Sequence, residues 1–108
     1  MKEQYREEID EIVKSILSAV PVSEIYLFGS FAKGEETPDS DMDFYVVIPD
    51  DSGMGESEAD FAIRMSMTGK AKRPIDMIVG AKSKFDRRKD YFYSIESEIK
   101  DTGVRIHG

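Results

Sequence analysis

The sequence has 108 residues with no cysteine and no tryptophan, and its single histidine, His107, is one residue from the end. Without cysteine, neither disulfide bonds nor thiolate metal sites can form. One histidine at the end of the chain also argues against zinc chemistry and against catalysis by an imidazole base. Any metal site in this chain is therefore expected to use oxygen ligands.

Long apolar runs are missing as well. A membrane crossing needs about 18 to 20 consecutive apolar residues, and no such run occurs. The chain opens with Met1, Lys2, Glu3 and Gln4 followed by more acidic residues, which is unlike a signal peptide. We therefore expect a cytoplasmic protein that is not bound to a membrane. The length and the hydrophobic share of 40% are typical of one compact domain over residues 1–108.

Positive charge is scarce, because the formal net charge is -7. A protein whose only task is to coat nucleic acid needs a cationic surface, so the sequence gives no strong sign of direct nucleic-acid binding. The charge is nevertheless uneven: residues 70–89 hold eight basic residues against only Asp76 and Asp86. This stretch either docks an anionic surface or consists of solvated side chains on a loop and a helix.

Apolar spacing and turn residues predict the elements. One apolar stripe predicts a helix over residues 2–19, ended by Pro21. Strands are predicted at 24–28, 41–48 and 75–79, the last bounded by Gly80, with a short one at 104–106.

Further helices are predicted over three later stretches. A helix at 57–68, starting near Ser57, is expected to bury Phe61, Ala62 and Met65. Helices are also predicted at 83–89 and at 92–101, the latter with Phe92, Ile95 and Ile99 on one face and Gly103 as its cap. The alternation predicts an α/β (α+β) domain with a small mixed sheet and helices packed against it.

Three aspartates form the candidate chemical centre. Asp41 and Asp43 are two positions apart in a predicted strand, so their carboxylates project from one face about 6.5 to 7 Å apart. Their mutual repulsion favours a divalent cation as counter-charge, and the oxygen ligands select Mg²⁺ or Mn²⁺. Asp76 lies among apolar residues of the third strand, where an unpaired carboxylate would be costly to bury. The alternative for Asp41 and Asp43 is a solvent-facing strand edge.

Gly29 and Ser30 lie where an apolar strand turns into a short helix. At such a turn, backbone amides and a hydroxyl can approach a phosphate closely, and Lys33 follows within the same turn. Taken alone, the pair indicates an ordinary tight turn. Ser30 is not expected to act as a nucleophile, because nothing in the sequence places a base beside it.

Together these motifs resemble a known family. The run Leu27-Phe28-Gly29-Ser30, followed after ten residues by Asp41-Met42-Asp43-Phe44, resembles the signature of the nucleotidyltransferase superfamily that includes DNA polymerase beta and kanamycin nucleotidyltransferase. Residues 29–43 are most similar to the minimal nucleotidyltransferases (MNT group) of prokaryotes. Residues 74–79 match the strand that carries the third carboxylate, and residues 95–104 resemble the closing helix and glycine turn. Lys33 occupies a position where the group often has arginine. Lysine keeps the positive charge, but it cannot form the bidentate hydrogen bonds that arginine makes with phosphate.

The resemblance implies a nucleotidyltransferase fold and a metal-dependent reaction. In this family two metal ions, Mg²⁺ or Mn²⁺, are held by acids that here correspond to Asp41, Asp43 and Asp76, and these residues are also implied as catalytic. The nucleotide, ATP or another NTP, would be bound by Gly29, Ser30, Lys33 and Ser40. A hydroxyl would attack the α-phosphorus and expel pyrophosphate, which transfers an NMP group.

The resemblance also implies a partner. Many minimal members pair with a small helical HEPN-type protein and act as its antitoxin, some by transferring AMP to it, so a hetero-complex or oligomer is implied. Two alternatives stay open: a degenerate binding module that neutralises its partner by contact, and an enzyme that modifies an antibiotic or another small hydroxyl compound. Retention of all three acids together with Gly29 and Ser30 favours the enzyme.

Overall fold

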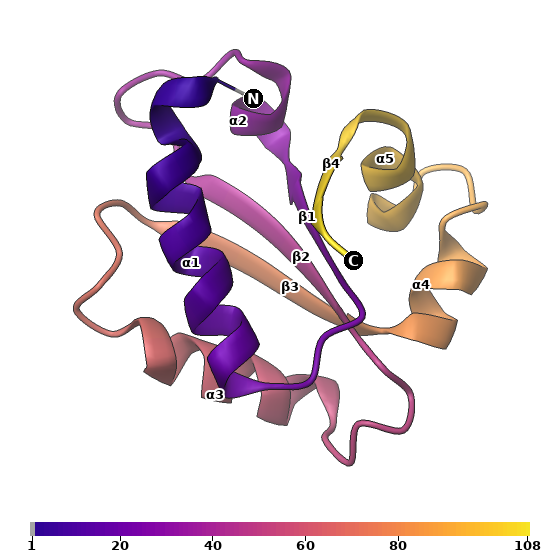
Figure 1. The fold of residues 1–108 in the computed structure, drawn as a ribbon. Helices are drawn as coiled ribbons and strands as arrows, with labels where there is room; N and C mark the ends of the chain where they lie inside the picture. Colours follow the sequence, from indigo (N-terminus) through magenta and orange to yellow (C-terminus); the bar gives the residue numbers. More distant parts are fainter. Residues whose placement is uncertain (1) are drawn as a thin grey trace.

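The computed structural model describes residues 2–108 and arranges them around a four-stranded mixed sheet with the order β3-β2-β1-β4 (Figure 1). The strands are β1 (Glu24–Phe28), β2 (Met42–Ile48), β3 (Ile75–Ala81) and β4 (Val104–His107). Strand β1 runs antiparallel to β2 and β4, whereas β2 and β3 are parallel. The parallel pair requires a crossover, which the third helix supplies.

Helices lie on both faces of the sheet (Figure 1). A short 3-10 turn (Glu3–Tyr5) leads into α1 (Arg6–Ala19), which packs on one face together with α3 (Glu56–Met67). The helices α4 (Lys82–Arg88) and α5 (Ile95–Thr102) cover part of the other face, and the short α2 (Gly29–Lys33) follows β1 directly. The predicted α/β class with a small mixed sheet is confirmed.

The face toward α1 and α3 carries the main core. Alternate residues of β2 point to this side, because successive side chains of a strand project to opposite faces. They meet one apolar stripe from each of the two helices. The buried members are Ile9, Ile12 and Ile16 of α1, Ala59, Ile63 and Met67 of α3, and Met42, Phe44, Val46 and Ile48 of β2.

The opposite face has a smaller core and leaves one end of the sheet open. Tyr45, Val47, Phe85 and Ile99 form its buried cluster. The Tyr45 hydroxyl donates to Glu96 Oε2 at 2.7 Å, and Arg88 Nε donates to Glu96 Oε1 at 2.9 Å. This network ties α4 and α5 to the centre of β2. Toward the amino-terminal ends of β2 and β3 the same face is not covered, so Asp76 is exposed and Ile78 is 37% exposed.

Two predicted helix faces were wrong. In α3, Phe61 and Met65 are 67% and 59% exposed, and the buried stripe is formed by Ala59, Ile63 and Met67. This stripe is buried because Ala59, Ile63 and Met67 pack into the main core together with α1 and the sheet. The helix begins at Glu56 with Gly55 as its N-cap, within one residue of the predicted start.

The last helix also differs from its prediction. It begins at Ile95 because the Ser94 hydroxyl caps it by accepting from the Ser97 amide at 2.9 Å. Phe92 therefore lies outside the helix and is 80% exposed.

Strand β3 is longer than predicted, since it runs through Gly80 to Ala81. A Cβ at residue 80 would overlap the Tyr45 hydroxyl, so glycine is needed inside the strand to make room for this ring. Glycine in a strand interior commonly marks such a close approach and not an end.

The basic stretch of residues 70–89 does not form one surface. Lys70, Lys72 and Arg73 lie in the connection before β3, and the later basic residues lie in or next to α4, at the opposite end of that strand. Several are paired internally, as Arg73 is with Glu8 at 2.7 Å. These basic residues therefore lie on a loop and a helix, as one of the two interpretations had it, and a docking role for them stays a prediction.

Within residues 2–108, no helix is both long and apolar enough to cross a bilayer.

Candidate active site

The candidate site lies at the uncovered end of the sheet, where β1 ends and β2 and β3 begin. Asp43 in β2 is the direct neighbour of Asp76 in β3 and of Phe28 in β1. The amide of Met42, the first residue of β2, donates to the Pro74 carbonyl at 3.2 Å, so the pairing extends one residue beyond the start of β3. Asp41 is the residue immediately before β2. The parallel register therefore brings together acids that are more than thirty positions apart in sequence.

Gly29 fits closely against Asp43. Its φ of +74° lies in the left-handed region, and a Cβ at this position would overlap Asp43 Oδ2. Glycine adopts this conformation without the steric cost that other residues meet. The backbone turn that opens α2 can therefore lie directly over the carboxylate, in a space that any side chain at residue 29 would fill.

The electrostatics of the acids are unfavourable without a counter-charge. Partial burial raises the pKa of Asp43 to about 6, with further contributions from the charge of Asp76, a hydrogen bond with Asp76 and the charge of Asp41. Two carboxylates that share a hydrogen bond need one proton between them or a cation beside them. At neutral pH, Asp43 thus carries a negative charge that its surroundings disfavour.

The donor set fits a hard divalent cation, since it consists only of carboxylates, and Mg²⁺ and Mn²⁺ prefer such oxygen ligands. Asp43 and Asp76 would be the ligands already in contact. Within residues 2–108, however, no three Asp, Glu, His or Cys side chains are grouped as a ready metal site. Asp41 affects Asp43 through its charge but does not complete such a group. Its side chain would have to turn toward the pair for a three-carboxylate site to form.

The predicted nucleotide-binding residues divide into two groups. Ser30, next to Gly29 in the first turn of α2, makes no side-chain hydrogen bond within the described chain, so its hydroxyl is available to a ligand. Lys33 ends α2, is exposed and has no ion pair among residues 2–108.

Ser40 is already engaged within its own loop. Its Oγ accepts from the Thr37 amide at 2.8 Å, and its amide donates to the Thr37 carbonyl at 3.0 Å. It therefore holds the turn that leads into Asp41. In this structure Ser40 supports the position of an acid, and its assigned contact with nucleotide stays a prediction.

Asp76 belongs to the candidate site for a different physical reason than the one expected from the sequence. Its carboxylate is exposed and not buried, so the cost of burying an unpaired charge is not what identifies it. Its position in the register directly beside Asp43 is what does so. A cavity of about 380 Å³ lies elsewhere, between α1 and residues 67–72, and none of the three aspartates lines it. We do not assign it to this site.

One buried carboxylate was missed by the sequence analysis. Glu96 is only 2% exposed and accepts from both Tyr45 and Arg88. The sequence signal was its position three residues before Ile99, which places an acid on the apolar side of a helix.

Comparisons with known proteins support the fold. Among solved structures, a candidate nucleotidyltransferase from Sulfolobus solfataricus superimposes with a TM-score of 0.62 at 23% sequence identity, covering 92% of this chain and 76% of that one. A toxin–antitoxin complex solved with AMP-PNP gives a TM-score of 0.63 at 18% identity, covering 92% and 72% respectively. These likenesses confirm the predicted nucleotidyltransferase fold.

A comparison with curated proteins gives no match. The sequence model of the nucleotidyltransferase domain matches residues 6–106, a span that includes Gly29, all three aspartates and most of the closing strand. The chain therefore belongs to the nucleotidyltransferase domain family.

Proposed function

We propose that this chain is a metal-dependent nucleotidyltransferase that transfers AMP from ATP to a hydroxyl on a separate protein. The observation that carries the proposal is the pair Asp43 and Asp76, held side by side by the β2–β3 register with the backbone of Gly29 directly against Asp43. This arrangement joins two carboxylates to a tight glycine turn and to the hydroxyl of Ser30, which makes no side-chain hydrogen bond within residues 2–108. Family membership supports the same reaction class.

Each residue has a role in this proposal. Asp41, Asp43 and Asp76 hold the divalent cations, and Gly29 and Ser30 hold the β and γ phosphates, with Lys33 as an added positive charge. Bound cations would neutralise phosphate charge and lower the pKa of the attacking hydroxyl. The acceptor oxygen forms a bond to the α-phosphorus while the bond to the pyrophosphate oxygen breaks. The hydroxyl proton passes to a site carboxylate, which we assign to Asp76.

The proposed acceptor is a HEPN-type toxin partner, with this chain as the antitoxin. Support for a partner of this kind comes from the toxin–antitoxin complex with AMP-PNP that shares the fold. The net charge of -7 also favours a protein acceptor over nucleic acid.

The experiment uses labelled ATP, Mg²⁺ and the product of the reading frame beside this gene. Mass spectrometry should find AMP on a partner hydroxyl with the parent chain and none with Asp41→Asn/Asp43→Asn. Ser30→Ala should slow transfer by about ten- to a hundredfold, the loss of one charge-assisted hydrogen bond worth about 1.5 to 3 kcal/mol, without abolishing it. A nucleotidylated Ser30 would refute the assigned role of this residue.

The second candidate is a binding module that neutralises its partner by contact alone. The observation in its favour is that Asp41 does not join the other two acids in a ready metal site within the described chain. If the partner stays unlabelled, and the double variant neutralises it as well as the parent does, this second function replaces the first.

A further inference from the structure

Three consecutive aromatic side chains project from the connection between α4 and α5. Tyr91, Phe92 and Tyr93, here named the aromatic tip, are 50%, 80% and 91% exposed. The rings of Phe92 and Tyr93 lie 4.1 Å apart, so they pack on each other and not on the core. A single exposed aromatic residue is ordinary, but an apolar group of three on one loop is typical of an interaction site.

The loop that carries the tip is firmly built. The amide of Tyr91 donates to the Arg88 carbonyl at 2.9 Å, and the amide of Ser94 donates to the Tyr91 carbonyl at 3.1 Å. The Ser94 hydroxyl donates to the Arg88 carbonyl at 2.6 Å, and Lys100 Nζ donates to Asp90 Oδ1 at 2.9 Å. These bonds fix the backbone on both sides of the aromatic residues. The tip is thus presented in a set conformation, which lowers the entropy cost of binding.

Tyr93 is held in a strained conformation. Its φ of +72° lies in the left-handed region, and it is the only non-glycine residue there in the described part of the chain. This conformation costs a bulky residue of the order of 1 kcal/mol or more. Tyr93 makes no contact with the core that would offset the cost, since its ring is almost fully exposed. A glycine would adopt this left-handed conformation at lower cost, so a tyrosine at residue 93 is best explained by a function of its side chain.

A positively charged hollow lies beside the tip. Its volume is about 330 Å³, and its basic lining residues are Lys82, Lys89, Lys100 and Arg105, with Glu24 as the one acid among them. Lys100 links the hollow to the tip, because its ammonium group binds Asp90, the residue before Tyr91. The four cations stand on a chain whose net charge is -7.

We propose that the aromatic tip and this hollow form the docking surface for the protein partner, which would present an apolar socket bordered by carboxylates. The proposal rests on the proposed function for the existence of that partner. Tryptophan, tyrosine and arginine dominate the energetic centres of protein interfaces, and complementary charges at the border set the association rate. The tip supplies the first kind of contact and the hollow supplies the second.

Two other occupants fit the surface less well. The four cations of the hollow are paired with three acids, Glu24, Asp86 and Asp90, which leaves a surplus of one positive charge. That surplus can orient an acidic protein surface, but it is too small for a nucleic acid, whose binding needs many uncompensated cations. A second copy joined by a two-fold axis would bring each cationic hollow against its own equivalent. A partner with acidic side chains meets neither difficulty.

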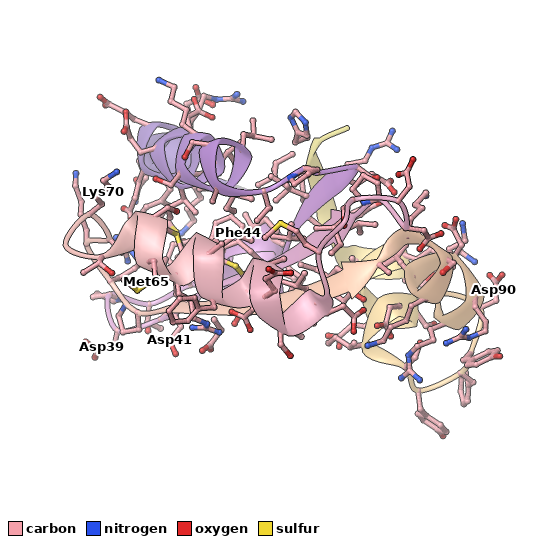
Figure 2. All side chains as sticks on the ribbon, turned by 90° about the horizontal axis from the view of Figure 1, so that it is seen from below. Asp39, Asp41, Phe44, Met65, Lys70 and Asp90 are labelled. Atoms are coloured by element: carbon pink, nitrogen blue, oxygen red, sulfur yellow. The ribbon has the colours of Figure 1, made fainter. Side chains whose placement is uncertain are left out.

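The docking surface is separate from the acids. Figure 2 shows Asp39 and Asp41 at one end of the molecule and Asp90 at the other. A partner bound at the tip therefore leaves the nucleotide site open. Changes at the tip should raise the KM for the partner without altering ATP binding.

The test measures the affinity of the neighbouring-frame protein for the parent chain and its variants by calorimetry, with ATP binding measured in the same samples. Tyr91→Ala/Phe92→Ala should weaken partner binding at least about tenfold, as expected for central interface residues, whereas Phe61→Ala, an equally exposed aromatic change on α3, should not. Lys89→Gln/Arg105→Gln should slow association most at low salt, unlike Lys70→Gln/Lys72→Gln.

Tyr93→Gly separates a binding role from a structural one. Because glycine accepts the left-handed conformation, the melting temperature should stay the same or rise while partner affinity falls. Equal affinity for all tip variants, or no binding by the parent chain, overturns the proposal. Dimerisation, or binding of a single-stranded RNA oligonucleotide, that the tip variants abolish would assign the surface to those ligands instead. If Asp41→Asn/Asp43→Asn still binds the partner but no longer transfers label to it, the result supports the docking surface and concerns only the catalytic residues.

Discussion

Replacing Asp43 by asparagine should make the metal-free protein more stable at neutral pH. The asparagine side chain keeps the shape of the aspartate but removes the negative charge that burial, Asp76 and Asp41 disfavour. The pKa of Asp43 rises from 3.8 to about 6. A change of roughly two units corresponds to about 3 kcal/mol, and because the side chain is only partly buried, solvent screening reduces this to about 1 to 2 kcal/mol.

The sign of the pH dependence follows from the raised pKa. Between about pH 4 and pH 6 the folded protein holds a proton on Asp43 more tightly than the unfolded chain does, so the stability of the parent chain falls as the pH rises through this window. Above about pH 6 the full penalty applies. Asparagine carries no charge at any pH. The advantage of Asp43→Asn should therefore be absent near pH 4 and complete near pH 7.5.

Urea denaturation in EDTA at the two pH values measures this difference. For a domain of this size, about 1 to 2 kcal/mol corresponds to a rise in melting temperature of roughly 4 to 12 °C. Millimolar Mg²⁺ should then stabilise the parent chain and not the variant, since a ligand raises stability only where it binds. A variant that is less stable than the parent at pH 7.5 in EDTA would refute the reasoning, because Asp43 would then be making a structural contact. An equal gain at both pH values would also refute it.

Three further substitutions test the packing around the site. Gly29→Ala should lower the stability by about 1 to 2 kcal/mol and abolish nucleotide binding, because the Cβ meets Asp43 and the left-handed φ disfavours alanine. A thermal melt measures the stability and an ATP titration measures the binding. Intact binding would contradict the proposed geometry. Gly80→Ala should cost about 1 to 3 kcal/mol in chemical denaturation by displacing the Tyr45 ring. Tyr45→Phe should cost about 1 to 2 kcal/mol, since Glu96 loses a buried donor, and an unchanged denaturation midpoint would show that water replaces it.

Local patterns were enough to predict the strands and the class of fold. Residues 24–28 and 42–48 carry β-branched and aromatic side chains between clear turn signals, and both segments form strands with those bounds or bounds one residue away. Gly29, Ser30, Asp41 and Asp43 could be recognised as one motif because all four lie within fifteen positions of the sequence. The structure places Gly29 against Asp43, a contact that the motif alone did not predict.

What could not be predicted depends on contacts between distant residues. The sequence of α3 offers two apolar stripes, and only docking on β3 decides that Ala59 and Ile63 are buried in place of Phe61 and Met65. Similarly, Gly80 reads as a strand end until the Tyr45 ring is known to occupy the space beside it. The exposure of the aromatic residues 91–93 follows from the Ser94 cap, which moves the helix start beyond them.

The contact between Gly80 and Tyr45 also bears on how reliably the acids meet. Strands can slip relative to one another, and a slip of one residue would turn Asp76 to the wrong face of the sheet. A slip of two residues would keep the face but put Ile78 or Lys82 where Gly80 now lies, and either side chain would collide with the Tyr45 hydroxyl. A steric clash at Tyr45, well away from the carboxylates, thus destabilises misaligned pairings of β2 and β3. A glycine that takes no part in the chemistry would in this way select the one alignment in which Asp43 and Asp76 are neighbours.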